Sequence, residues 1–173
     1  MAPRIITFVR HGQAHHNLNC NYHLRDPYLT PLGEAQCHEL SKEFPSEPQV
    51  DLLVSSPLKR TIQTTLLGFK KQAESGAKVE LLAELQEADA FPCDTGSSRD
   101  DLEKEELFQG LDFSGLPDDW TSKAYIPPGS FRGRAFVLTA IRKENGPQTL
   151  IPLGNVPESP VNGSSPDRKA MLS

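Results

Sequence analysis

The chain has 173 residues, which gives room for one domain of ordinary size and excludes two full ones. Its 18 lysines and arginines against 23 aspartates and glutamates leave a net charge of −5, which disfavours a nucleic-acid-binding protein with a basic face. No apolar run approaches the roughly 18 residues of a membrane-spanning helix, and no cleavage-like pattern follows the short apolar stretch 5–9. We therefore expect neither a nucleic-acid nor a membrane partner, and a cytoplasmic location with the nucleus as an alternative.

The first predicted element is a buried strand over residues 4–9, which is rich in β-branched residues and short enough for a parallel sheet. It ends at Arg10, His11 and Gly12. Ligands of open α/β sheets bind beyond the carboxyl ends of the strands. This tripeptide is therefore a candidate site.

A helix is expected next, with Thr30 as its N-cap, Pro31 in its first turn and Pro45 as its stop. Four apolar residues can share one face of this helix at a spacing of three to five residues. They are Leu32, Ala35, Leu40 and Phe44.

The same order of elements is predicted to repeat. A short strand at 51–54 precedes a helix that we expect to be capped by Ser56, with Pro57 in its first turn. Apolar residues then recur at helical spacing, at Leu58, Ile62, Leu66 and Phe69. A third strand is expected at 78–82, so β-α-β-α-β accounts for residues 4–82 and predicts a parallel sheet with right-handed crossovers.

The remainder of the chain is less regular. Residues 84–119 hold 2 basic and 12 acidic side chains, a net charge of −10, and we expect a solvated insertion or lid with a short acidic helix at 100–108. A last element is expected within 132–144. Residues 147–173 contain five prolines among small polar residues, so we predict a domain over 1–146 and a disordered tail over 147–173.

Two candidate groups could carry chemistry at one edge of this sheet. His11 ends the first strand, and Arg60 falls one turn inside the helix that follows the second strand. A histidine can attack phosphorus to form a covalent intermediate. A guanidinium matches phosphate oxygens, and a helix N-terminus favours anions. Together the two groups indicate phosphoryl chemistry.

These pieces resemble the histidine phosphatase superfamily, in its phosphoglycerate mutase-like branch. The matching stretches agree in order and spacing over about residues 4–96: Val9 to Gln13 with Asn17, Leu29 to Gln36, Val54 to Thr64, and Leu85 to Glu87. Pro92 to Gly96, and the segment on to Lys123, resemble a subgroup of small mutase-like proteins. The resemblance implies an α/β three-layer sandwich with a mostly parallel central sheet flanked by helices, incomplete at its C-terminal end.

The resemblance also implies roles for residues. His11 matches the nucleophile that becomes phosphorylated, and Glu87 the acid that protonates the leaving oxygen, with Glu84 as the alternative. Phosphate-binding positions match Arg10, Arg60, Asn17 and Gly12. It implies a small phosphorylated substrate or inorganic phosphate as partner and no metal or other cofactor.

One part of the family pattern has no match. The family has a second histidine after a late strand, whereas the histidines of this chain are at 11, 15, 16, 23 and 38 only. In one alignment 136–139 is that strand and Ala140 takes the histidine position. In the other, which we prefer because Arg132, Arg134 and Arg142 resemble the family's basic helix, 131–144 is the helix before that strand and Gly154 or Asn155 lies at the site. Losing such a donor costs about 2.7–4 kcal/mol of transition-state stabilisation.

Three functions are therefore weighed: a phosphatase, a degenerate member that binds phosphate or a protein, and a mutase. A metal site is the remaining alternative, because His15, His16, Cys20, His23, Cys37 and His38 are close in sequence. Their spacing fits no closed tetrahedral pattern, so we expect His15 and His16 at a pocket rim or in a loop. With Cys93, the cysteines form an odd and sparse set that predicts reduced thiols.

Overall fold

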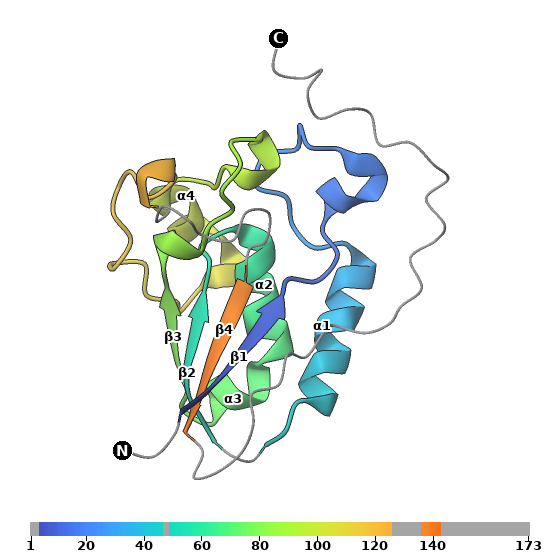
Figure 1. Cartoon of the computed structure of the whole chain (residues 1–173), viewed down its shortest axis with the longest axis vertical. Helices are drawn as coiled ribbons and strands as arrows, with labels where there is room; N and C mark the ends of the chain where they lie inside the picture. The colour runs from blue at the N-terminus through green and yellow to red at the C-terminus, as the bar shows by residue number, and fades with distance from the viewer. Residues whose placement is uncertain (1–3, 47–48, 126–135, 143–173) are drawn as a thin grey trace.

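The computed structural model describes residues 4–46, 49–125 and 136–142, and these form an α/β unit around a four-stranded sheet (Figure 1). The strand order is β1-β4-β2-β3. The strands are β1 Arg4–Arg10, β2 Val50–Ser55, β3 Lys78–Leu81 and β4 Phe136–Arg142. β2 and β3 pair in parallel, and β4 runs antiparallel to both β1 and β2, so the first three strands point in one direction as predicted.

β4 corrects the preferred prediction of a helix over 131–144. β-branched residues alternate along it at 137, 139 and 141, and this pattern favours a strand over the basic helix expected from the arginines. The strand fills the gap between β1 and β2. Its antiparallel register places Phe136 opposite Arg10 and Ala140 opposite Ile6, so Ala140 lies away from the end of β1 that carries His11. Positions 154 and 155 lie outside the described residues.

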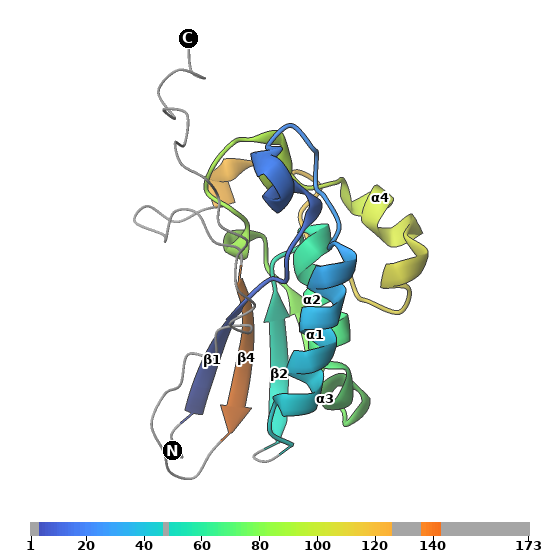
Figure 2. The same ribbon diagram turned by 90° about the vertical axis from the view of Figure 1, so that its right-hand side faces the viewer.

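Three helices, α1 Pro31–Glu43, α2 Lys59–Gly68 and α3 Lys70–Glu74, lie against one face of the sheet (Figure 2). On the other face, the side chains of Ile6 and Phe8 in β1 are 46% and 43% exposed. The described residues therefore contain the sheet and one helical layer of the predicted sandwich.

The predicted start of α1 is confirmed, because Thr30 Oγ1 accepts a hydrogen bond from the Gly33 backbone N at 3.0 Å. Its predicted buried face is partly wrong. The buried positions are Gly33, Cys37 and Leu40, followed by Phe44, whereas Leu32 and Ala35 are exposed. The cause is a close backbone approach, since a Cβ at Gly33 would overlap the Gln13 carbonyl.

The predicted cap of α2 by Ser56 is wrong. The helix begins at Lys59 after Leu58, and its first backbone N–H donates to Asp26 Oδ1 at 3.0 Å. Ser56 Oγ accepts instead from the Leu58 backbone N within the preceding turn. A residue 33 positions away in the chain therefore caps the helix that carries Arg60.

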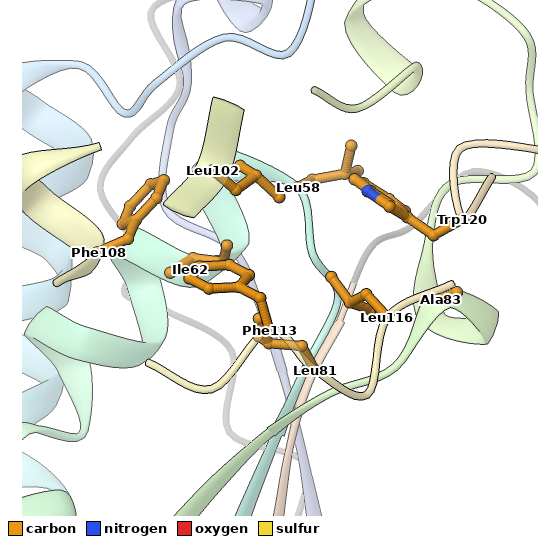
Figure 3. Close-up of a cluster of buried hydrophobic side chains, with 9 residues drawn as sticks. All are labelled: Leu58, Ile62, Leu81, Ala83, Leu102, Phe108, Phe113, Leu116 and Trp120. Atoms are coloured by element: carbon orange, nitrogen blue, oxygen red, sulfur yellow. The ribbon is translucent and has the colours of Figure 1, made fainter. Parts of the chain in front are cut away.

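Two apolar clusters hold the unit together. The first lies between the sheet and the helices and contains Val9, Leu40, Phe44, Val50, Leu53, Phe69 and Ala77. The second joins α2 and β3 to the acidic segment (Figure 3). It contains Leu58, Ile62, Leu81, Ala83, Leu102, Phe108, Phe113, Leu116 and Trp120.

The second cluster corrects the prediction that residues 84–119 form a solvated insertion or lid. Buried side chains such as Leu102 and Phe108 fasten this segment to the domain, while most of its acidic side chains face solvent. The predicted helix 100–108 divides into α4 Arg99–Lys104 and η4 Glu106–Phe108, because Glu105 has extended backbone angles. The other short 3₁₀ turns are η1 His15–Cys20, η2 Ala83–Leu85, η3 Pro92–Asp94 and η5 Lys123–Tyr125.

The predicted boundary at residue 146 and the predicted tail 147–173 lie outside the described residues. In the part of the chain that the structure describes, no helix has the length and apolar character to cross a bilayer.

We predict that Gly96→Ala destabilises the fold, because a Cβ at this position would overlap the fully buried indole ring of Trp120. Overpacking of this kind costs about 1–3 kcal/mol. In a domain of this size each kcal/mol lowers Tm by about 2–4 °C, which thermal denaturation can measure. Gly115→Ala is the matched control, since nothing lies within 4 Å of its Cβ, and an equal Tm for both variants would contradict the packing.

Candidate active site

Three segments that lie far apart in the chain meet beyond the carboxyl ends of β1, β2 and β3. His11 follows β1, Arg60 is the second residue of α2, and Glu87 comes shortly after η2. All three side chains are buried, at 6%, 0% and 6% exposure. The structure therefore brings together the residues that the sequence predicted to be the nucleophile, a phosphate-binding arginine and the acid.

The hydrogen bonds of His11 fix its tautomer. Its Nδ1 lies 2.6 Å from the Gly12 carbonyl oxygen, which can only accept, so Nδ1 carries the hydrogen. Nε2 then holds a lone pair, and it accepts from Arg60 Nε at 3.2 Å. Burial, and next the charge of Arg60, hold the pKa of His11 well below its usual value. The ring is therefore neutral at pH 7, with its lone pair on Nε2, where it accepts the Arg60 hydrogen bond.

Arg60 is the centre of the site. Its Nη1 donates to the Cys93 carbonyl oxygen at 2.6 Å and its Nη2 to Asp94 Oδ1 at 3.2 Å. The Glu87 carboxylate lies 3.8 Å from Nη2. A buried guanidinium needs acceptors of this kind to offset its desolvation, so these contacts fix both the arginine and the segment 87–94.

Asp94 lies at the site, although sequence analysis assigned it no role beyond its place in the stretch 92–96, which resembles a subgroup of small mutase-like proteins. Burial raises the pKa of its carboxyl, and the charge of Arg60 acts in the opposite direction. It is the closest carboxylate to Arg60. The sequence could indicate this residue only through the resemblance of residues 92–96 to that subgroup, and the resemblance gives the aspartate no role.

Lys123 is a second residue that sequence analysis gave no role. Its Nζ donates to the backbone oxygens of Glu87 and Asp94 at 2.9 and 2.7 Å, and to Gln86 Oε1 at 3.0 Å. Burial lowers its pKa. Lys123 therefore joins the two acidic residues of the site through their backbone. No local pattern predicts this contact, because its partners lie 29 to 37 residues away.

Glu84, the alternative acid, lies on the exposed side of η2, so it does not share the buried position of Glu87. Among the described residues, no three His, Cys, Asp or Glu side chains are close enough together to hold a metal ion. Cys20, Cys37 and Cys93 are free thiols, as predicted.

The remaining predicted phosphate-binding residues have other partners. Gly12 donates from its backbone N to Thr64 Oγ1 at 3.1 Å, and a Cβ there would lie 2.7 Å from the Gly33 carbonyl oxygen. Asn17 is exposed, and its Oδ1 accepts from the Ala14 backbone N at 2.9 Å. The geometry therefore supports close packing for Gly12 and a loop contact for Asn17. Arg10 is exposed at the end of β1, where its positive charge lowers the pKa of His11.

His16 joins the site although sequence analysis placed it at a rim or in a loop. Its ring is 6% exposed and its centroid lies 5.8 Å from that of His11. Burial, and then the charges of Arg60 and Arg10, lower its pKa to about 4. The exposed neighbour His15 does not share this burial, and His38 lies on the exposed side of α1.

Comparison with known proteins finds a family model and a relative that match this chain. The model of the histidine phosphatase superfamily (branch 1) matches residues 6–148. The Schizosaccharomyces pombe protein named "Probable phosphatase SPAC513.02" is 32% identical over 120 residues, which cover 67% of this chain and 55% of that protein. The chain thus spans little more than half the length of that relative.

Two solved structures overlap part of the chain. Mycobacterial glucosyl-3-phosphoglycerate phosphatase, in complex with VO3, is 25% identical at a TM-score of 0.39 and covers 49% of this chain and 40% of its own. Phosphoserine phosphatase from Entamoeba histolytica, in complex with 3-phosphoglyceric acid, is 19% identical at a TM-score of 0.38. The match covers 65% of this chain and 58% of that protein. The family assignment therefore rests on the match to the family model.

We predict that acid destabilises the fold through His16. Its pKa is near 6.5 in the unfolded chain and about 4 in the folded one, so the unfolded state binds the proton first. The free energy of unfolding then falls as pH decreases from about 6.5 to about 4, by about 2–3 kcal/mol from this group. The lowered pKa of His11 also makes acid destabilise the fold. The raised pKa values of Asp26 and Asp94 have the opposite effect, because these carboxyls bind a proton in the folded state first.

Urea denaturation at pH 7 and pH 4.5 measures this effect. His16→Gln should lose about 2 kcal/mol less on acidification than the wild type. His15→Gln, the exposed neighbour, should lose as much as the wild type. Equal losses in all three proteins would contradict a buried neutral His16.

Proposed function

Because the chain belongs to branch 1 of the histidine phosphatase superfamily, we propose that it is a phosphomonoester hydrolase acting through a phosphohistidine on a small phosphorylated metabolite. The observation that carries this proposal is the geometry of His11. Its neutral ring is anchored through Nδ1, and its Nε2 lone pair lies against the Arg60 guanidinium. A nucleophile and an anion-binding group are thus joined in one buried place.

The proposed reaction has two steps. The Nε2 lone pair of His11 attacks phosphorus, the bond from phosphorus to the substrate oxygen breaks, and Glu87 gives its proton to that oxygen. Water then attacks the phosphohistidine, Glu87 takes a proton from the water, and the N–P bond breaks to release phosphate. The low pKa of His11 favours the first step because the ring keeps its lone pair at neutral pH.

Arg60 stabilises the charge on the transferring phosphoryl group in this mechanism. A guanidinium has five N–H groups, and three of them have acceptors among the described residues, in His11, Cys93 and Asp94. Two are left for phosphoryl oxygens, and Arg10 adds a second positive charge at the end of β1. Positioned cations of this kind supply most of the catalysis of phosphoryl transfer.

Glu87 is the better candidate for the acid than either neighbouring carboxylate. Asp94 is held as the hydrogen-bond acceptor of Arg60, and Glu84 is exposed. Glu87 is buried, its carboxylate lies 3.8 Å from Arg60 Nη2, and Lys123 fixes its backbone. Its position beside the guanidinium makes its carboxyl group the one best placed to exchange a proton with a leaving oxygen.

The alternative of a degenerate member that binds phosphate without turnover has two specific observations in its favour. The sequence has no histidine after His38, and the Asp94 carboxylate takes an N–H group of Arg60 that a phosphate could use. Binding without turnover would then reflect a site with too few donors for the transition state.

The experiment that separates these functions compares two aryl phosphates, one with a good and one with a poor leaving group. The wild type should hydrolyse both, and His11→Ala should hydrolyse neither. Glu87→Gln should lose about 10²–10⁴-fold in kcat/KM on the poor leaving group, because that oxygen needs a proton when the phosphohistidine forms, and much less in kcat/KM on the good one.

Glu84→Gln is the matched control and should resemble the wild type on both substrates. Turnover that persists in His11→Ala would contradict the proposal. Phosphate-dependent thermal stabilisation of a wild type without turnover would favour the degenerate alternative.

A further inference from the structure

His16 holds a buried hydrogen-bond donor that no described residue uses. Its Nε2 lies 3.2 Å from Asn17 Nδ2, which can only donate, so Nε2 accepts and the ring hydrogen is on Nδ1. Nδ1 is buried and has no hydrogen-bond partner among the described residues. Buried donors are almost always paired, so one that is left without a partner beside a nucleophile calls for an explanation.

The loop fixes the ring in this position. Ala14 pairs with Leu29 as an isolated bridge, and Asn17 Oδ1 accepts from the Ala14 backbone N at 2.9 Å while its Nδ2 donates to His16. The amide of Asn17 therefore sets the orientation of the ring from one side. This accounts for Asn17 as a residue that positions His16.

The surroundings of His16 favour an anion. Its ring centroid is 5.8 Å from that of His11, and the charges of Arg10 and Arg60 both act on it. Burial, and then the charges of these cations, keep the imidazole neutral, so it adds a hydrogen-bond donor to the site without adding a charge. Two guanidiniums and one neutral N–H are a donor set for the oxygens of a phosphoryl group.

We propose that Nδ1–H of His16 donates a hydrogen bond to a non-bridging oxygen of the phosphoryl group that His11 receives. The inference rests on the proposed function and adds to it a residue that contacts substrate. The site would then have a second histidine donor, supplied by the loop after β1. The sequence offers no histidine after residue 38 that could supply it.

The test uses orthovanadate, an anion that resembles phosphate in shape and charge, together with turnover of an aryl phosphate. His16→Phe keeps a ring of similar size and removes the donor. It should lower kcat by about 10²–10³-fold and weaken vanadate binding at least about 10-fold. His16→Asn, whose Nδ2 can occupy the place of Nδ1, should recover part of both.

His15→Phe is the matched control. Its side chain is exposed, and its backbone N–H, which donates to the Tyr28 carbonyl oxygen at 3.1 Å, is unchanged by the substitution. It should bind vanadate and turn over substrate like the wild type. Wild-type values in His16→Phe would overturn the inference while leaving the phosphatase proposal intact.

Other outcomes are also decisive. A wild type without turnover whose vanadate binding depends on His16 would support the donor and contradict the phosphatase. A wild type without turnover or vanadate binding would overturn both. If His16→Phe does not fold, ¹⁵N NMR of the wild type decides: vanadate should shift the Nδ1 resonance of His16, and an unchanged resonance would overturn the inference.

Discussion

The buried guanidinium of Arg60 is the interaction on which the site depends. It is fully buried, and a charge in that position is stable only when acceptors surround it. The acceptors come from two separate segments, His11 after β1 and the stretch 93–94 beyond β3. Removing one partner of a buried ionic group costs about 3–5 kcal/mol, so the arginine fixes the position of both segments. The Arg60 charge, which the proposed function uses to stabilise the transferring phosphoryl group, therefore also holds the site segments together.

The acidic segment supports this centre from outside. Trp120 belongs to the apolar cluster on α2 and β3, and its carbonyl oxygen accepts from Gln86 Nε2 at 2.8 Å. Gln86 in turn accepts from Lys123, which also holds the backbone of Glu87 and Asp94. Burial of apolar side chains thus positions the carboxylates of the site through a short chain of hydrogen bonds. A segment with a charge of −10 can serve this purpose because most of its charged side chains face solvent, whereas apolar ones such as Leu102 and Phe108 are buried.

Local sequence patterns predicted the three strands and the two longer helices between residues 4 and 82, and with them the meeting of His11 and Arg60, but they did not predict η1 or α3. Such patterns are informative where each residue's conformation depends on its neighbours, as at the Thr30 cap and Pro31. They were not informative where the partner is distant in the chain. Asp26 caps α2 and Lys123 joins the acidic residues across separations that no spacing rule covers.

Two further differences between the predicted and the observed structure have other causes. β4 was expected as a helix because its arginines resemble a basic helix, yet the gap between β1 and β2 is filled by a strand. His16 was expected at a pocket rim or in a loop, and it does lie in the loop after β1, but it is buried there. Its burial follows from the Asn17 contact and from the packing of the loop beside His11, and neither is visible in a one-dimensional pattern.

The protonation state of His11 is the most direct measure of this arrangement, and ¹⁵N NMR of the histidine ring nitrogens reads it. Between pH 6 and 8 we expect a neutral ring with hydrogen on Nδ1 and a lone pair on Nε2 that accepts from Arg60. A ring that is protonated at pH 7, or one that carries its hydrogen on Nε2, would contradict the proposed nucleophile and its contact with Arg60.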